Sequence, residues 1–262
     1  MNRCATLTFL GTGTSQGVPV IGCRCDVCRS GDPRDARLRT SALYEAGECR
    51  ILFDAGPDFR VQMLRRGISR LSAILLTHKH KDHIGGIDDV RALNFVDYPR
   101  IRPVHIYATP DTAACVRKDF DYAFEARPYR GVPVIELHEI DPSRPFEVDG
   151  VEIIPVSGRH ERFEVTGYRI GDAAYMTDFK SIDDVQLSKL CGVNTLVINA
   201  LRFTPHDSHL SVGEALDIIR RIAPQRAYLT HMSHEIGLHA LADAQLPPGV
   251  RFAYDGLEIE IG

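Results

Sequence analysis

The most constraining feature of the sequence is a dense group of potential metal ligands that follows an apolar, strand-like run. The run Ala73–Leu76 leads into the segment Thr77–His83, which contains four candidate ligands, His78, His80, Asp82 and His83. In an extended chain the first two point to the same side, and a turn into a helix near Asp82 would bring the other two to the same place. Imidazole and carboxylate groups bind zinc, manganese or iron. The competing interpretation is a histidine-rich surface turn.

Short apolar runs rich in β-branched residues recur along the chain and predict strands. They lie at Ala5–Leu10, Ser41–Tyr44, Arg50–Phe53, Ala73–Thr77, Val104–Ala108, Val132–Leu137, Val151–Val156, Val165–Ile170, Ala173–Met176, Thr195–Asn199, Ala227–Leu229 and Arg251–Tyr254. Helical periodicity is confined to Asp58–Arg66, Asp111–Phe120, Ser181–Leu190 and Ser211–Ile222. The last begins with the capping-box pair Ser211 and Glu214. Because strands occur in runs as well as alternating with helices, we predict an α+β fold with two packed sheets and outer helices.

Length and composition indicate one globular domain. The chain has 262 residues, of which 44% are hydrophobic and 25% charged, and α/β folds of about 250 residues commonly form one unit. We therefore expect a single domain over residues 1–262, soluble and cytoplasmic, with no membrane partner and no signal peptide. The 31 basic and 35 acidic residues give a net charge of −4. This balance provides no broad positive field, which argues against a large nucleic acid as the partner.

Three of the seven cysteines, Cys23, Cys25 and Cys28, are clustered. An odd number with this uneven spacing is not typical of a secreted disulfide framework and fits a reducing compartment. Three thiolates so close together suit a structural zinc ion, which needs a fourth ligand. The candidates are His234, His239 and Cys49, and the spacing does not choose among them. The alternative is three reduced thiols without a metal.

Further candidate ligands follow three other strand-like runs. His160 comes after Val151–Val156, Asp178 after Ala173–Met176 and His231 after Ala227–Leu229. Taken singly, each could equally be a capping or surface residue. Together with the first cluster they are enough for two ions, which at a separation of ~3.5–4 Å can clamp a displacement reaction.

The order of these residues resembles the metallo-β-lactamase superfamily in its dinuclear hydrolase form. The shared features are the His-x-His-x-Asp-His motif at 78–83, the distant histidine, the aspartate after a strand, a Thr-His pair near the C-terminus, and the segments Phe9–Gly13, Leu52–Gly56 and Asp255–Gly256. The resemblance covers nearly the whole chain. It implies an αβ/βα sandwich of two mixed sheets.

The same resemblance implies a ligand set. One ion would be held by His78, His80 and His160, the other by Asp82, His83 and His231, with Asp178 bridging them. Asp54 would orient the metal loop without binding a metal itself.

The cysteine cluster and the segments around it resemble one subgroup, the cyclic phosphodiesterases of the carbon–phosphorus lyase pathway and their relatives. The matching segments are Gly11–Pro19, which leads into the cysteines, and His231–His234. This resemblance implies His234 as the fourth zinc ligand. The glycines of Gly11–Gly17 lack the Gly-Lys-Ser/Thr ending of a phosphate-binding loop, so we expect a tight turn beside the metal site instead.

These features predict a metal-dependent hydrolase that acts on a small or cyclic phosphate ester with two zinc or manganese ions, besides one structural zinc. A hydroxide held between two divalent ions would attack phosphorus at neutral pH. The candidate catalytic residues are Asp82, which is also a ligand, and His209. The resemblance favours His209 over His206 for contact with a phosphoryl or leaving oxygen. The alternative is that both histidines lie in a solvated loop.

Three other functions compete with this hypothesis. A tRNA 3′-processing endonuclease shares the ligand set, but the acidic charge and the lack of a long basic arm argue against it. A pyrroloquinoline-quinone-biosynthesis-like protein, acting in binding or oxidation, resembles the cysteine cluster. The third is a protein with structural zinc alone.

Two further segments and two histidines also have predicted roles. The polar segment Arg29–Arg39 is expected to be a mobile loop. The aromatic segment Asn94–Tyr129 could form a substrate wall, the face of a homodimer or ordinary core. His105 and His138 lie in strand-like runs, and we treat them as structural.

Overall fold

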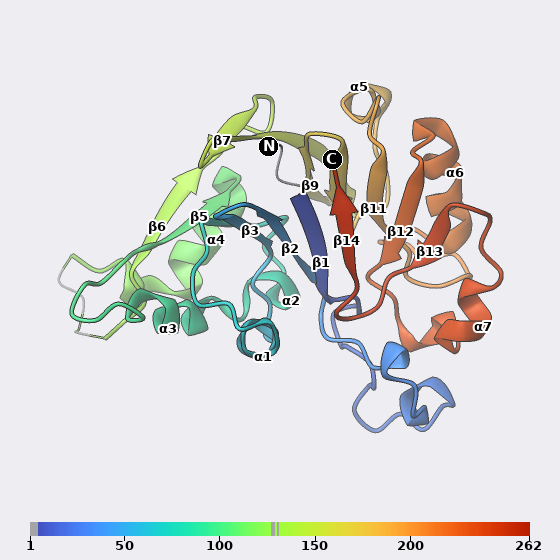
Figure 1. Cartoon of the computed structure of the whole chain (residues 1–262), viewed down its shortest axis with the longest axis horizontal. Helices are drawn as coiled ribbons and strands as arrows, with labels where there is room; N and C mark the ends of the chain where they lie inside the picture. Colours follow the sequence, from blue (N-terminus) through green and yellow to red (C-terminus); the bar gives the residue numbers. More distant parts are fainter. Residues whose placement is uncertain (1–4, 127–128, 130) are drawn as a thin grey trace.

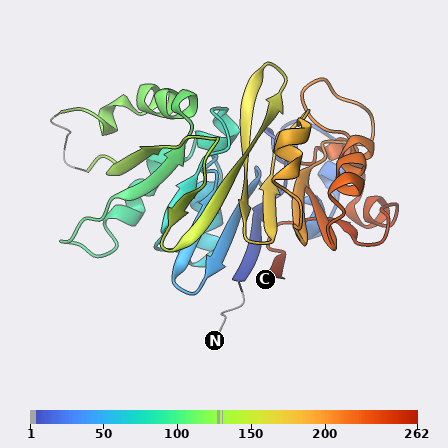
Figure 2. The same cartoon turned by 90° about the horizontal axis from the view of Figure 1, so that it is seen from above.

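The computed structural model of the chain describes residues 5–126, 129 and 131–262. Two seven-stranded sheets pack face to face, and helices cover the outer side of each (Figure 1 and Figure 2). The predicted sandwich and its α+β class are confirmed. No helix among the described residues is long and apolar enough to cross a membrane.

The first sheet has the strand order β14-β1-β2-β3-β4-β5-β6. Its strands are β1 (Ala5–Gly11), β2 (Ser41–Ala46), β3 (Cys49–Phe53), β4 (Ala73–Leu75), β5 (Val104–Ala108), β6 (Ile135–Glu139) and β14 (Glu258–Ile261). Neighbouring strands from β14 to β3 are antiparallel, and those from β3 to β6 are parallel. Because β3 and β4 end at the same edge, Asp54 and Thr77, which follow them, come together there.

The second sheet has the order β13-β12-β11-β10-β9-β8-β7. Its strands are β7 (Phe146–Val148), β8 (Val151–His160), β9 (Phe163–Ile170), β10 (Ala173–Met176), β11 (Thr195–Asn199), β12 (Arg226–Thr230) and β13 (Val250–Phe252). Strands β10 to β13 are parallel. Since β8 and β10 are both antiparallel to β9, β8 runs in the same direction as β10. The ends of β8, β10 and β12 therefore lie at one edge.

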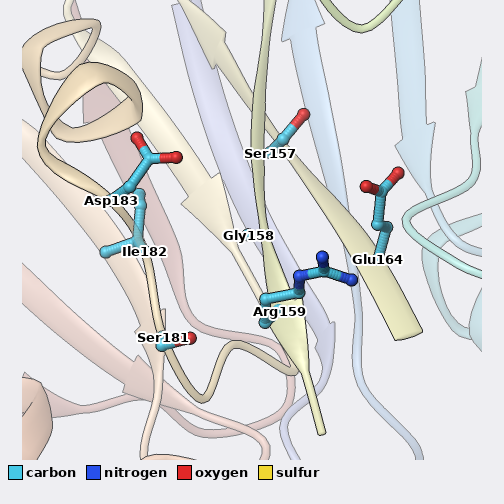
Figure 3. Close-up of a pocket in the computed structure, with 7 residues that line it drawn as sticks. All are labelled: Ser157, Gly158, Arg159, Glu164, Ser181, Ile182 and Asp183. Carbon is cyan, nitrogen blue, oxygen red and sulfur yellow. The ribbon is translucent and has the colours of Figure 1, made fainter. Parts of the chain in front are cut away.

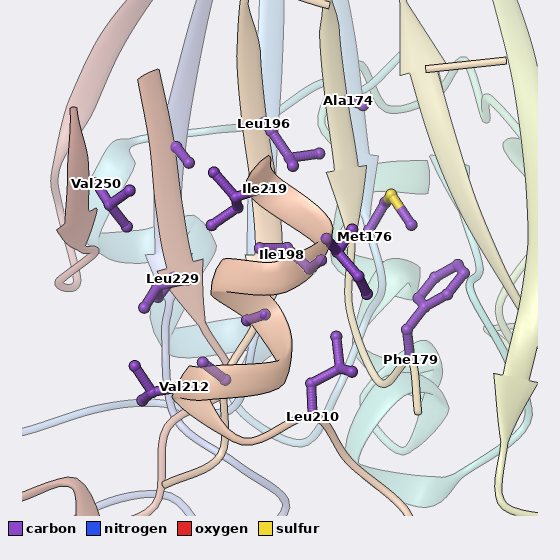
Figure 4. Close-up of a cluster of buried hydrophobic side chains, with 14 of the residues drawn as sticks. Ala174, Met176, Phe179, Leu196, Ile198, Leu210, Val212, Ile219, Leu229 and Val250 are labelled. Carbon is purple, nitrogen blue, oxygen red and sulfur yellow. The ribbon is translucent and has the colours of Figure 1, made fainter. Parts of the chain in front are cut away.

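The helices are α1 (Phe59–Arg66), α2 (Lys81–Ile84), α3 (Arg91–Asn94), α4 (Pro110–Asp119), α5 (Asp184–Ser188), α6 (Val212–Ile222) and α7 (His239–Asp243). The helices α1 and α4 bury apolar residues against the outer face of the first sheet. Helix α6 packs on the second sheet, where Ile219 lies among Leu196, Ile198 and Leu229 (Figure 4).

Aromatic side chains fill the space between the two sheets. Phe53 of the first sheet stacks on Tyr175 of the second, with ring centroids 4.6 Å apart, and both are fully buried together with Tyr168. Burial of such large rings stabilises the sandwich by roughly 1.5–3 kcal/mol per side chain. This core holds the two sheets, and hence their strand ends, in fixed relation.

Several predicted elements differ from the structure in extent. Strand β8 continues to His160, four residues beyond the predicted run, because residues Ile154–His160 pair with β9. Strands β7 and β14 were not predicted: β7 is only three residues long, and β14 alternates Glu and Ile as an edge strand does. The predicted helix Ser181–Leu190 is shorter, because Asp183 caps it by accepting a hydrogen bond from the Gln186 N–H.

The prediction that Arg29–Arg39 is a mobile loop is wrong. Asp35 and Arg37 are buried, and the Arg37 guanidinium donates to the Thr12 hydroxyl and the Ala253 carbonyl, each at 2.9 Å, and lies 3.1 Å from the His239 ring. The charge of this segment reflects internal hydrogen bonding rather than solvation. The segment packs against the C-terminal part of the chain.

Part of the aromatic segment Asn94–Tyr129 belongs to the core. Phe120 is buried, and Tyr122 and Phe124 pack against the same core, so core packing accounts for them. Tyr98 and Tyr129 are largely exposed, and residues 127 and 128 lie outside the described part of the chain.

The capping box predicted for α6 is present, and its contribution to stability can be measured. The Ser211 hydroxyl accepts from the Glu214 N–H at 3.3 Å, and the Glu214 carboxylate accepts from the Ser211 N–H at 2.8 Å. We expect Ser211→Ala to lower the free energy of unfolding by about 1 kcal/mol, measured by urea denaturation. Thr109→Ala, at the start of α4 where no side chain caps the helix, should cost clearly less. Equal losses would contradict the cap's contribution.

Candidate metal centre

All seven predicted active-site ligands meet where the strand ends of both sheets converge. His78 and His80 follow β4, Asp82 and His83 lie in α2, and His160 is the last residue of β8. Asp178 follows β10, and His231 follows β12. The parallel direction of β8, β10 and β12 is what places the last three ligands together.

His78, His80 and His160 form the first ligand group. The facing nitrogens His78 Nε2 and His80 Nδ1 are 2.9 Å apart, and the His160 ring centroid lies 5.3 Å from that of His78 and 5.0 Å from that of His80. The three donor atoms lie within 4.8 Å of one another. His160 Nδ1 is 2.8 Å from the Ser208 carbonyl oxygen, so this contact directs Nε2 toward the group. Three imidazoles at this spacing can hold one divalent ion.

Asp82, His83, Asp178 and His231 form the second ligand group. His83 Nε2 is 3.2 Å from an oxygen of Asp82 and 3.2 Å from Asp178 Oδ2. The other oxygen of Asp178, Oδ1, is 3.1 Å from His231 Nε2. Asp178 also lies within 4.8 Å of His160, so its carboxylate stands between the two groups.

Unpaired buried nitrogens show that this set fits a cation. The Nε2 atoms of His83 and His231 are buried, and the carboxylate oxygens 3.1–3.2 Å away form no hydrogen bond with them among the described residues. A buried polar atom without a partner costs about 1–3 kcal/mol, and convergent nitrogens and carboxylate oxygens are what a divalent metal binds. The residues present therefore fit two metal ions.

Buried carboxylates dominate the electrostatics of the site. Burial opposes a charge on His83, but Asp178 and Asp82 outweigh it and hold its pKa well above the ordinary value. Burial likewise opposes ionisation of Asp178, yet His231 and His83 keep its pKa well below the usual range. The ionised carboxylates of the site therefore favour a positive charge between them, as a divalent metal ion would supply.

Asp54 supports the ligands from outside the group, as the resemblance implies. Its carboxylate accepts from the Thr77 N–H at 2.8 Å and from the Thr77 hydroxyl at 2.9 Å, and it lies 2.7 Å from His83 Nδ1. These contacts orient the His83 ring so that Nε2 faces the ligands. Sequence analysis missed Thr77, although its place between β4 and His78 could have identified it.

The backbone at the site is tightly packed and locally strained. Asp54, Asp178 and His231 have φ values of 62°, 64° and 59°, a left-handed conformation that is uncommon for residues other than glycine and that concentrates at functional sites. A Cβ on Gly56 would lie 2.0 Å from the Asp82 carbonyl oxygen, and one on Gly86 would lie 2.0 Å from the Gly56 carbonyl oxygen. These glycines allow the backbone segments around the site to approach closely.

His209 lies with His160 and Asp178 in the site, whereas His206 contacts His209 and the Ser208 hydroxyl. The His209 ring stacks on His231 at 4.8 Å, and its Nδ1 is 3.6 Å from Asp178 Oδ1. His206 is next to His209, with ring centroids 5.4 Å apart. Burial and the neighbouring His231 lower the pKa of His209 to about 3. In this state His209 is a neutral imidazole that can donate a hydrogen bond.

The three clustered thiols are brought together with His234, not with His239 or Cys49. His234 Nδ1 lies 3.3 Å from the sulfurs of Cys23 and Cys25 and 3.7 Å from that of Cys28. His239 contacts Arg37 instead, and Cys49 is buried in β3. The Cys28 N–H and His234 lower the pKa of Cys25 to about 6, which favours a thiolate. Three cysteines and one histidine suit tetrahedral zinc.

A nearby hollow lies outside the ligand groups. It has a volume of about 420 Å³ and is lined by Ser157, Arg159, Glu164 and Asp183 among others (Figure 3). Arg159 precedes His160 in β8, so their side chains point to opposite faces of the sheet. This hollow contains none of the predicted ligands.

Comparisons with known proteins agree with this geometry. The Beta-lactamase superfamily domain model matches residues 49–232. The crystal structure of a diphosphatase from the PhnP family is 41% identical, with a TM-score of 0.92, and the match covers 100% of this chain and 98% of that one. The structure of Zn²⁺-bound PqqB from Methylobacterium extorquens is 21% identical over 98% of this chain and 100% of that one, with a TM-score of 0.77, and shares the fold.

Two curated relatives add to these matches. An octanoyltransferase of Porphyromonas gingivalis is 42% identical over 253 residues, which is 95% of this chain. The chain spans only 50% of that relative's length. A ribonuclease Z of Mycobacterium sp. is 28% identical over 86% of this chain and 83% of its own.

The thiol cluster predicts a stability effect. We expect Cys25→Ser to lower the melting temperature of the zinc-loaded protein by at least about 2–4 °C, the shift per kcal/mol in a chain of this size, because structural zinc binding contributes folding free energy. Differential scanning calorimetry measures this. Cys191→Ser, at an exposed cysteine, is the matched control, and equal melting of both variants would argue against a zinc site.

The ligand groups also predict a metal content. After removal of loosely bound ions, elemental analysis should find about three divalent ions per chain that these groups account for, two in the paired groups and one on the thiols. Mild chelation should remove the pair first, because their site keeps open positions. A protein loaded with metal that retains one ion or none would contradict the paired site.

Proposed function

Because the chain belongs to the β-lactamase superfamily and has the fold of its metal-dependent hydrolases, we propose that it hydrolyses a small or cyclic phosphate ester with two divalent ions. The observation that carries this proposal is the position of Asp178, whose carboxylate stands between two complete ligand groups. The similarity to a PhnP-family diphosphatase supports phosphorus as the reacting centre.

The chain's own residues would hold and orient the reactants. Two divalent ions, when bound, would lower the pKa of a water molecule toward about 7 and neutralise phosphoryl oxygens. His78, His80 and His160 would hold one ion and Asp82, His83 and His231 the other, with Asp178 shared. Asp54 would keep His83 in the orientation that this requires. Asp82, the other candidate catalytic residue, would contribute as a metal ligand.

His209 would contact the substrate at the mouth of this set. As a neutral imidazole it can donate a hydrogen bond to a phosphoryl oxygen or to the departing oxygen. Burial keeps it uncharged in the free protein, and an anionic phosphate beside it would favour its protonated form. It could then pass a proton to the leaving group.

The bond that is cleaved decides between two substrate classes. A phosphodiester is the leading candidate, and a diphosphate is the second because the PhnP-family relative is described as a diphosphatase. In both, the leaving oxygen gains negative charge as its bond to phosphorus breaks, so the same site could act on either. Assays with bis(p-nitrophenyl) phosphate and with a nucleoside diphosphate, run side by side, separate them.

The alternative functions receive less support. A ribonuclease Z is similar over most of the chain, but the net charge of −4 does not favour binding of a transfer RNA. A protein with structural zinc alone would not need seven ligands converging beside the thiol cluster. We propose a small-molecule substrate in a reducing, cytoplasmic setting, and the exposed Tyr98 and Tyr129 as places to look for a homodimer contact.

The shared carboxylate predicts a loss of activity. Asp178→Asn should reduce hydrolysis of bis(p-nitrophenyl) phosphate by at least about 10³-fold, because an amide cannot supply the negative charge that joins the two ions. Asp172→Asn, at the opposite end of β10, is the matched control and should retain activity. If Asp178→Asn kept wild-type turnover with its metals bound, the ligand assignment would fall.

The place of His209 predicts a dependence on the leaving group. His209→Ala should lower kcat by about 10²-fold or more on a substrate with a poor leaving group, the usual scale of acid–base assistance. A p-nitrophenolate barely needs a proton, so that substrate should lose less. Equal losses on both, with unchanged metal content, would indicate charge stabilisation instead. No loss on either would remove His209 from the mechanism.

A further inference from the structure

A further group of potential metal ligands lies at the edge of the first sheet. His105 belongs to β5, and Glu136 and His138 belong to β6, the edge strand of that sheet (Figure 1). In the parallel register His105 is opposite Glu136, and Tyr107 is opposite His138. These residues therefore share one face of the sheet. None of them belongs to the ligand groups at the strand ends or to the thiol cluster.

The three donor atoms converge on one point. His105 Nδ1 is 3.0 Å from His138 Nε2 and 3.2 Å from an oxygen of Glu136, and all three lie within 4.8 Å of one another. Ligand atoms of a tetrahedral zinc ion at about 2.0–2.1 Å from the metal are separated by similar distances. Two imidazoles and one carboxylate are the donor set of open zinc sites.

The surroundings hold the group in place while leaving it open. The Tyr107 ring stacks on His138, with ring centroids 4.5 Å apart and an angle of 18° between the planes. It also stacks on Phe146, with ring centroids 5.3 Å apart. The side chains of His105 and Glu136 are 38% and 53% exposed. An ion can therefore enter from solvent, and the positions not taken by protein would be filled by water.

The positions of the three donor atoms suit a metal ion. His105 Nδ1 lies close to both His138 Nε2 and an oxygen of Glu136, and a single N–H placed between them cannot form a full hydrogen bond to both neighbours. A divalent metal ion can accept a lone pair from all three donor atoms at once.

We propose that His105, Glu136 and His138 form a further binding site for a divalent transition metal of the zinc class, with an open coordination position. A bound ion would link the edge strand β6 to β5. Under this proposal His105 and His138 would bind a metal, in place of the structural role expected from the sequence.

The test is a difference in metal content between matched variants. The protein, with its other sites loaded, is dialysed against a series of buffered free zinc concentrations, and bound zinc per chain is measured by elemental analysis. We expect wild type to bind one more ion per chain than His138→Gln. Glu139→Gln, in the same strand but on the face toward α4, where Glu139 pairs with Arg117, should match wild type.

A second variant keeps the test decisive if His138→Gln folds poorly. Glu136→Gln changes one exposed atom and should weaken binding of the additional ion at least about tenfold, the loss that even a supporting residue of a metal site causes. Circular dichroism without added zinc checks that each variant is folded. If wild type, His138→Gln and Glu136→Gln bind zinc alike, the site is refuted. Because all variants share the other ligand groups, this result does not depend on the proposed hydrolysis.

Discussion

The structure depends on the burial of carboxylates among imidazoles where the two sheets meet. Asp54 and Asp178 are almost completely buried, and an ionised carboxylate is costly there unless it is paired and hydrogen-bonded. Asp54 meets this need through Thr77 and His83. Asp178 is surrounded by His83 and His231. The strand ends must therefore converge to within hydrogen-bonding distance, and a divalent cation would complete the charge balance.

Contacts across the sandwich keep these strand ends together. The hydroxyls of Thr40 and Thr230, which belong to opposite halves of the chain, are 2.9 Å apart. The Asp255 carboxylate accepts from the Thr12 N–H at 2.9 Å and from the Leu38 N–H at 2.7 Å. The thiol cluster adds a link of the same kind, because its cysteines come from the N-terminal loop and His234 comes from beyond β12. A metal on that cluster would brace the loops beside the site without taking part in the chemistry.

The rigid centre leaves substrate choice to the side chains around it. Phe163, at the start of β9, lies beside His80, and the cationic groups of Lys79 and Arg162 lie 5.0 and 5.1 Å from its ring centre. Lys79 also pairs with Asp111 at 2.7 Å. Under the proposed function, these cationic groups would favour an anionic substrate, whereas the ligand groups would accept any phosphoryl centre. Folds of this kind carry different activities because loops vary over a constant site. Under the proposed function, the metal ligands would therefore determine the chemistry, and the side chains around them would determine the substrate.

The sequence by itself determined the strand-rich class, most strand positions and the candidate ligands, because alternation, turn residues and ligand spacing are local properties. It predicted the capping box of α6 and the shared side of His78 and His80 for the same reason. Only the tertiary structure decided that His234 rather than Cys49 or His239 meets the thiols, that Arg37 is buried, and that His105 and His138 face each other beside Glu136. Each of these depends on register and packing between segments distant in the chain, and no local pattern encodes how two strands align or which loop crosses to the other sheet.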